Sequence, residues 1–191
     1  RRPRSAGSSP CPGQGPEATA PAKTTGYLDA VKKQMGGVPN IIGTMAQSPA
    51  ALGGFLALSG ALAAGTLSTA EREQIALAVA GANECDYCAS AHTVLGGRSG
   101  LAADEIGRNL QGHSTDPRMQ AALRFASRII ATRGQVSDED LSAVRGAGFS
   151  YEQVVEILAN TVLNIFTNYL NHAAATEIDF PVVKTGTPAA A

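Results

Sequence analysis

Cys85, Cys88 and His92 are the residues with the clearest capacity for chemistry, and they lie close together in the segment ECDYCASAH (84–92). On a helix these three positions fall within about 60° of one another, so both sulfurs and the imidazole share one face. Residues 81–83 (GAN) interrupt the preceding apolar run and place Cys85 in the first turn of the next helix. Free N–H groups and the helix dipole there favour a thiolate. We therefore expect a thiol of low pKa beside an imidazole that can exchange a proton near neutral pH.

Other roles for the same residues are open. Two cysteines and one histidine could be three ligands of a zinc site, but a structural site needs a fourth ligand. Cys11 lies in a Pro- and Gly-rich tail, and His113 and His172 are distant in sequence, so we expect no metal. A haem-attachment motif needs His directly after the second Cys, where this chain has Ala89. Buried, inert core cysteines stay an alternative, whereas a thioredoxin-like site would need a βαβ setting that the sequence does not show.

The elements around this segment are predicted to be helices. Ser, Thr or Asp residues at helix starts, two Pro residues at first helical positions and three capping-box patterns recur along the chain. No run alternates with period two between hairpin turns, so we expect no strand of consequence. The fold class is all-α, a single-domain bundle of about eight helices. We place them near 27–35, 49–64, 69–82, 84–97, 102–110, 117–133, 138–146 and 151–175.

The ends of the chain differ from its middle in composition. Residues 1–26 are rich in Pro, Gly, Ser and Ala, and they hold too few large apolar side chains to offset the entropy of ordering. We predict a disordered tail at 1–26, one helical domain at 27–183 and a second disordered tail at 184–191.

Charge and hydropathy indicate which kinds of partner the chain can bind. The formal net charge is −1 and no Lys/Arg cluster lies outside the first four residues, which argues against nucleic acid. Residues 34–70 carry no charge, but the glycines at 53, 54, 60 and 65 argue against a membrane span. The helix at 151–175 is apolar around most of its circumference, so we expect subunit contacts in a homo-oligomer. Three cysteines without a disulfide framework are typical of a reducing compartment, here the cytoplasm.

A wider pattern includes Glu73. The spacing E-x11-C-x2-C-x3-H joins Glu73, Cys85, Cys88 and His92 within AEREQIALAVAGANECDYCASAHT, and it resembles the core motif of the AhpD-like alkylhydroperoxidase branch of the carboxymuconolactone decarboxylase superfamily. VPNIIGTMAQSPAAL ahead of it and NIFTNYLNHAAATEIDFP after it are also similar to that family, so the resemblance covers about residues 27–182. Taken alone, Glu73 would only be a favourable first-turn acid. The resemblance gives it a role in proton transfer, for which we expect it to be partly buried.

The resemblance implies an all-helical subunit in a trimer or hexamer, without a cofactor, that reduces peroxides. Cys88 would be the attacking cysteine, Cys85 the resolving and more exposed one, and His92 with Glu73 the proton relay. A lipoylated or thioredoxin-like dithiol protein would recycle the pair. Some members have a second His between the cysteines, where this chain has Tyr87. The helix N-terminus, in contrast, favours Cys85 as the thiolate.

Two other functions compete with a thiol-dependent peroxidase. The first is a carboxymuconolactone-type decarboxylase, although those members lack the Cys pair. The second is a non-enzymatic redox-sensing protein whose Cys pair changes oligomer packing.

Overall fold

The structure, a computed structural model, describes residues 20–186 and is all-helical, without a strand in that range. This confirms the predicted fold class. A short 3-10 helix, η2 (Ala22–Thr24), leads into nine α-helices within the described range. They are α1 (Thr25–Met35), α2 (Asn40–Met45), α3 (Pro49–Ala63), α4 (Thr69–Ala82), α5 (Asp86–Arg98), α6 (Ala103–Asn109), α7 (Pro117–Thr132), α8 (Asp138–Gly146) and α9 (Tyr151–Ala174).

Side-chain caps fix the starts of the helices that carry the site. The Ser68 hydroxyl accepts a hydrogen bond from the Glu71 N–H, and the Glu71 carboxylate accepts one from the Ser68 N–H, which forms the predicted capping box of α4. The predicted capping boxes of α8 and α9 are also present. The starts of α4, α8 and α9 are therefore set by local sequence.

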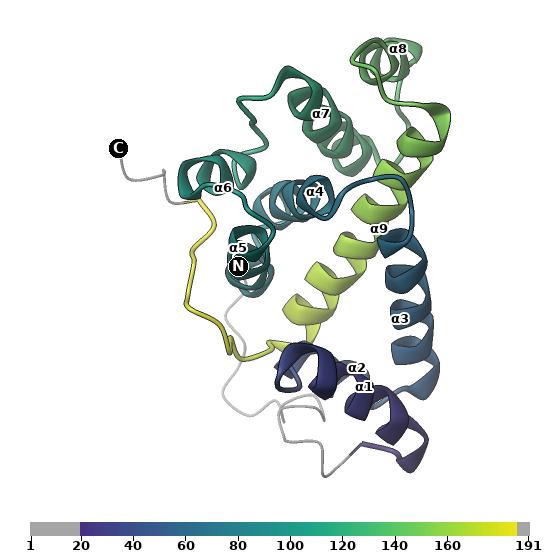
Figure 1. Cartoon of the computed structure of the whole chain (residues 1–191), viewed down its shortest axis with the longest axis vertical. Coiled ribbons are helices and arrows are strands. Elements are labelled where there is room, and N and C mark those ends of the chain that lie inside the picture. Colours follow the sequence, from purple (N-terminus) through teal and green to yellow (C-terminus); the bar gives the residue numbers. More distant parts are fainter. Residues whose placement is uncertain (1–19, 187–191) are drawn as a thin grey trace.

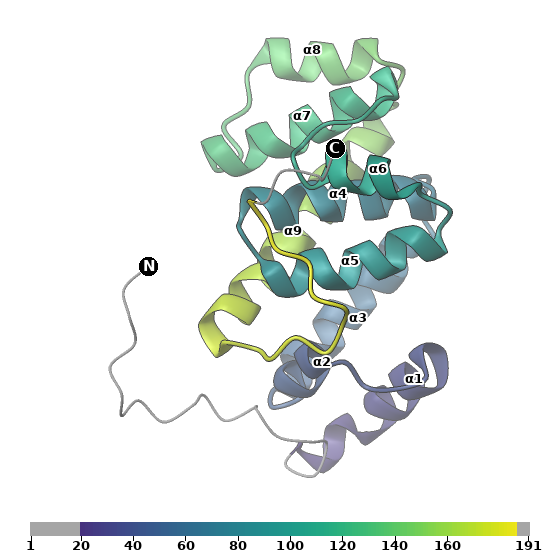
Figure 2. The ribbon, with the colours of Figure 1, turned by 90° about the vertical axis from the view of Figure 1, so that its left-hand side faces the viewer.

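The core is built around α4, which packs against α5, α7 and α9 (Figure 1). Ile75 and Val79 of α4 are fully buried with Leu123 of α7 and Ile157 of α9 in the largest hydrophobic cluster. The helix α5 runs beside α4, and the chain after α9 passes back along α5 (Figure 2). This arrangement brings the first turn of α4, one face of α5 and the second half of α9 together.

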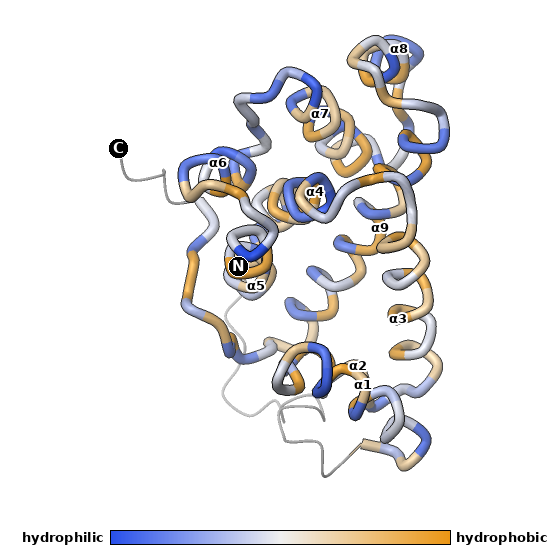
Figure 3. Tube along the Cα trace, in the orientation of Figure 1, coloured by the Kyte–Doolittle hydropathy of each residue, from blue (hydrophilic) through white to orange (hydrophobic). Residues whose placement is uncertain are grey.

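The N-terminal helices form a separate cluster at the other side of α9. Leu28, Val31, Ile42 and Leu52 are buried there, and α3 contacts α2 and α9. The surface of α3 carries no charged residue and is largely pale to orange in the hydropathy colouring of Figure 3. Within residues 20–186, no helix combines the length and the hydropathy needed to cross a bilayer.

Two expectations about the elements were wrong. We did not predict α2 from the sequence, because a helix of only six residues with an internal Gly43 has little stability of its own. Its first N–H groups are instead satisfied by distant side chains, the Asn40 N–H by Asp179 and the Ile41 N–H by the Tyr87 hydroxyl. These partners lie 139 and 46 residues away in sequence.

The predicted tail boundaries were also wrong where the structure describes them. Residues 20–26 form η2 and the start of α1, and Thr24 is fully buried with its hydroxyl bound to the Pro21 carbonyl. Residues 184–186 lie against α5, because Lys184 and Thr185 bind the Asp86 carboxylate. The rest of both predicted tails, with Cys11, lies outside the described residues.

The close packing at the end of α4 gives a stability prediction. A Cβ atom added at Gly81 would overlap the Leu110 carbonyl oxygen, which is backbone and cannot rotate away. We expect Gly81→Ala to destabilise the fold by about 1–3 kcal/mol, the usual cost of overpacking. Gly54→Ala is the matched control, since nothing lies within 4 Å of a Cβ there. That change inside α3 should be neutral or stabilise by about 0.5–1 kcal/mol. Chemical denaturation of both variants checks this, and equal stabilities would contradict it.

Candidate active site

The cysteine pair is formed by the chain reversal between α4 and α5. Glu84 adopts a left-handed backbone conformation (φ 53°), and the Cys85 N–H donates to the Ala80 carbonyl at the end of α4. Cys85 is then the N-cap of α5, one position before the first helical residue, and its sulfur accepts a hydrogen bond from the Cys88 N–H at 3.3 Å. The two sulfurs lie 2.7 Å apart. The structure thus brings the predicted pair into direct contact, with both cysteines free.

The two thiols have opposite pKa shifts. The Cys88 thiol, as hydrogen-bond partner, lowers the pKa of Cys85 below its ordinary value against the effect of burial. The Cys88 N–H, the Asn171 amide and the charge of His92 act in the same direction. The pKa of Cys88 is raised well above its ordinary value, because Cys85 holds the thiolate next to it and burial adds to the shift. Of the two thiols, Cys85 is therefore the one that loses its proton first.

Access to the two sulfurs differs from the expectation. Cys85 is 1 % exposed and Cys88 is 3 % exposed, so Cys85 is not the more exposed cysteine of this subunit. Cys88 lines a cavity of about 470 Å³, whereas Cys85 does not. The reason is that the Cys85 sulfur is bound to the Cys88 N–H as the cap of α5, while Cys88 lies on the face of α5 that the cavity meets.

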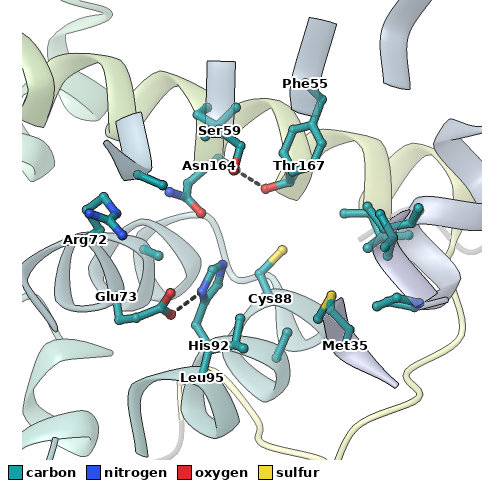
Figure 4. A pocket seen from close by; sticks show the side chains of 18 of the residues that line it. Met35, Phe55, Ser59, Arg72, Glu73, Cys88, His92, Leu95, Asn164 and Thr167 are labelled. Atoms are coloured by element: carbon teal, nitrogen blue, oxygen red, sulfur yellow. Dashed lines mark hydrogen bonds and ion pairs between the residues drawn. The ribbon is translucent and has the colours of Figure 1, made fainter. Parts of the chain in front are cut away.

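His92 lies one turn beyond Cys88 and binds Glu73, the fifth residue of α4. The distance from His92 Nδ1 to Glu73 Oε2 is 2.8 Å, and the two side chains are 19 % and 16 % exposed. Burial alone would lower the pKa of His92, but the Glu73 carboxylate outweighs it and raises that pKa above its ordinary value. Figure 4 shows Glu73 meeting His92 at the cavity wall, with Cys88 beside them. The structure therefore brings all four predicted site residues together, with Glu73 partly buried as expected.

Amide side chains of α9 complete the site, and the sequence analysis did not identify them. The Asn171 amide donates to the Cys88 sulfur at 3.2 Å. Asn168 lowers the pKa of Cys88, and Asn164 helps to raise that of His92. Positions 164, 168 and 171 share one helix face, so the signal was a polar stripe in an otherwise apolar helix.

Tyr87 and Asp86 attach the chain after α9 to the site helix. The Tyr87 hydroxyl donates to Asp179 at 2.7 Å and accepts from the Ile41 N–H at 3.2 Å. Asp86, the first residue of α5, binds Lys184 at 2.9 Å and the N–H and hydroxyl of Thr185. Burial and the neighbouring Asp179 raise the pKa of Tyr87, so its hydroxyl is a hydrogen-bond donor rather than a base.

The cavity has two chemically different walls. Cys88, His92, Glu73, Asn164 and Thr167 face it from α4, α5 and α9 (Figure 4). The opposite wall comes from the N-terminal helices and is mostly apolar, with Val31, Met35, Ile42, Phe55 and Leu56.

The zinc alternative lacks a ligand set in this part of the chain. Among residues 20–186, no three His, Cys, Asp or Glu side chains are grouped so that they could hold a metal ion. His113 and His172 are both exposed, and His172 lies in the last turn of α9.

Comparison with known proteins gives matches to one family model and to several solved structures. Residues 49–128 match the model of the carboxymuconolactone decarboxylase family. Among solved structures, an uncharacterized peroxidase-related protein from Ralstonia eutropha JMP134, described as an alkylhydroperoxidase AhpD core, has a TM-score of 0.76 at 29 % identity, over 87 % of this chain and 90 % of that one. No curated protein is similar enough to count as a match.

Two further structures share the fold. An uncharacterized peroxidase-related protein from Silicibacter sp. TM1040 has a TM-score of 0.76 at 24 % identity, over 88 % of this chain and 93 % of that one. The debrominase Bmp8 has a TM-score of 0.71 at 21 % identity, over 89 % of this chain and 90 % of that one. The family model matched by residues 49–128, the AhpD-core structure at 29 % identity and the assembled Glu73, Cys85, Cys88 and His92 site together support the AhpD-like branch of the carboxymuconolactone decarboxylase superfamily for this chain.

Proposed function

We propose that this protein is a thiol-dependent peroxidase that reduces hydroperoxides through Cys88 and Cys85. One observation carries the proposal. The two sulfurs lie 2.7 Å apart, next to a hydrogen-bonded His92–Glu73 pair, and Cys88 and His92 open on the same cavity. A nucleophilic thiolate, a second thiol in reach and a proton donor are the groups that peroxide reduction needs.

The first step uses the shared charge of the pair. Proton transfer from Cys88 to Cys85 places the thiolate on Cys88, where the Asn171 amide donates to the sulfur. That thiolate attacks one oxygen of the O–O bond, the bond breaks, and the alcohol leaves after taking one proton from His92. The product is a sulfenic acid on Cys88. Cys88 is the attacking residue because it lines the cavity and Cys85 does not.

The second step closes the disulfide. The Cys85 sulfur attacks the sulfenic acid sulfur and expels hydroxide, which takes a proton to leave as water. His92, held by Glu73, exchanges these protons with the cavity. An external dithiol then reduces the disulfide by thiol–disulfide exchange and is itself oxidised. A lipoylated or thioredoxin-like protein fits this role, and because the cycle needs a supply of dithiol, we place it in the cytoplasm.

Oxidation of the pair is the first test. One equivalent of an organic hydroperoxide should remove two titratable thiols and two hydrogens from the intact mass, mapped to Cys85 and Cys88. Cys85→Ser should instead gain one oxygen on Cys88, because no thiol is left to resolve the sulfenic acid. Cys88→Ser should not react with the peroxide. The assigned roles are reversed if Cys88→Ser is oxidised while Cys85→Ser is inert, and a disulfide to Cys11 would contradict the pair.

The proton relay is tested by turnover. His92→Ala or Glu73→Gln should reduce the rate of peroxide consumption with a dithiol by about 10²–10⁴, the usual contribution of general acid–base catalysis. His113→Ala is the control, since His113 is exposed outside the site and its loss should leave the rate unchanged. Circular dichroism should show intact helices in all three. If Glu73→Gln kept full activity, Glu73 would have no role in proton transfer and would only be a favourable charge near the start of α4.

We also propose that the protein is a homo-oligomer in which α9 pairs with α9 of a second copy. Exposed apolar side chains recur on one side of this helix at spacings of three and four, which is typical of helix pairing. They are Tyr151, Val155, Leu158, Val162, Phe166 and Tyr169, from 39 % to 75 % exposed. A self-complementary stripe can cover itself about a two-fold axis, and larger assemblies such as the trimer or hexamer would use the uncharged α3 as well.

Sedimentation velocity tests the stripe. The wild type should sediment as an oligomer at micromolar concentration, and the double variant Val155→Lys, Val162→Lys should shift to a smaller species because buried lysines would repel one another. Leu141→Lys is the matched control, since Leu141 is an exposed residue of α8 off the stripe. A monomeric wild type, or equal shifts in both variants, would rule out this interface.

A further inference from the structure

The cavity wall that carries Cys88 and His92 also contains Arg72, which the proposed reaction does not use. Arg72 lies next to Glu73 in the first turn of α4, is half-buried and lines the cavity. One guanidinium nitrogen donates to the Leu67 carbonyl at 2.6 Å and the other terminal nitrogen donates to the Thr69 hydroxyl at 3.2 Å. These contacts hold the side chain in place but involve only neutral acceptors.

The carboxylates that could neutralise Arg72 are bound elsewhere. Glu71 pairs with Arg118, and Glu73 pairs with His92. Glu156 accepts the N–H groups of Thr66 and Leu67. Within residues 20–186, Arg72 forms no ion pair. A fixed, half-buried guanidinium without a carboxylate is a ready partner for an anionic group, because it binds carboxylates with two parallel hydrogen bonds.

The charges around the cavity leave this cation uncompensated. Glu73 is the one carboxylate among the described lining residues, and it is already bound to His92. Arg98, which is exposed, adds a second positive charge to the lining. An anion entering the cavity therefore meets a net positive wall.

The opposite wall fits an apolar chain. The side chains that α1, α2 and α3 turn toward the cavity are mostly aliphatic or aromatic, and Figure 4 shows Met35 on the far side of Cys88 from Arg72 and Phe55 next to Thr167. The volume of about 470 Å³ is within the range of sites that enclose a molecule of moderate size. The reactive sulfur thus lies between a cationic group and an apolar surface.

We propose that the substrate is an amphipathic acid hydroperoxide, whose carboxylate binds Arg72 and whose hydrocarbon chain lies against α1–α3. This inference rests on the proposed peroxidase function and adds the substrate class. Carboxylate binding at Arg72 positions the hydroperoxide group of the chain at Cys88, and Arg72 determines specificity without entering the reaction.

Kinetics with a matched pair of substrates test the proposal. A fatty-acid hydroperoxide and its methyl ester, both below their micelle concentrations, differ only in the charge at one end. Wild type should have a KM about tenfold or more lower for the acid, since a hydrogen-bonded charged pair contributes about 1.5–3 kcal/mol. Arg72→Gln should remove this preference, Arg72→Lys should keep part of it, and tert-butyl hydroperoxide should be reduced equally by all three. Arg124→Gln, an exposed change of the same charge on α7, should behave as wild type.

A binding measurement separates failure of this inference from failure of the peroxidase function. Calorimetry of Cys88→Ser with dodecanoate, which cannot react, should show binding that Arg72→Gln in the same background loses. If every hydroperoxide is inert but dodecanoate binding depends on Arg72, the peroxidase function fails and the anion site stands. If hydroperoxides are reduced but acid and ester have equal KM values, or dodecanoate binds equally without Arg72, the anion site is overturned.

Discussion

Stabilisation of a thiolate on the buried cysteine pair is the constraint on which the rest of this site depends. A thiolate removed from water needs hydrogen-bond donors and positive charge in place of its hydration. Three helices supply them. The start of α5 gives the Cys88 N–H to Cys85, α9 gives the Asn171 amide to Cys88, and α4 gives Glu73, which raises the pKa of His92 and so favours a cation beside the sulfurs. The packing of α4 against α5 and α9 is thus also the electrostatic support of the pair.

The part of this support that is local could be predicted from the sequence. Cys85, Cys88 and His92 share a helix face because of their spacing alone, and the capping boxes fix where α4 and α9 begin. The link from Glu73 to His92 needed the family pattern, because first-turn acids are common on helices. The expected exposure of Cys85 was wrong, since the cap position binds its sulfur to the Cys88 N–H and leaves it buried.

The contacts that could not be predicted join residues far apart in the chain. The Asn171 amide reaches a sulfur 83 residues away, and Asp179 satisfies the start of α2 across 139 residues. Their side chains are ordinary polar residues, and only the packing of whole helices decides what they touch. The same holds for Lys184 and Thr185, which bind Asp86 and so offset the negative charge that it places next to Cys85. The composition of the chain end predicted a tail for these two residues, because composition does not show that Asp86 binds them.

Tyr87 shows how this site differs from family members that have a histidine between the cysteines. Its hydroxyl is bound on both sides, by Asp179 and by the Ile41 N–H, and its raised pKa keeps the proton on it. A second imidazole here could share in proton transfer, whereas Tyr87 instead attaches α2 and the chain after α9 to the site helix. In the proposed reaction, proton movement at the cysteines therefore depends on the single imidazole of His92. Its hydrogen bond to Glu73 at 2.8 Å consequently has two effects. It holds the ring toward the cavity, and it raises the pKa of the imidazole.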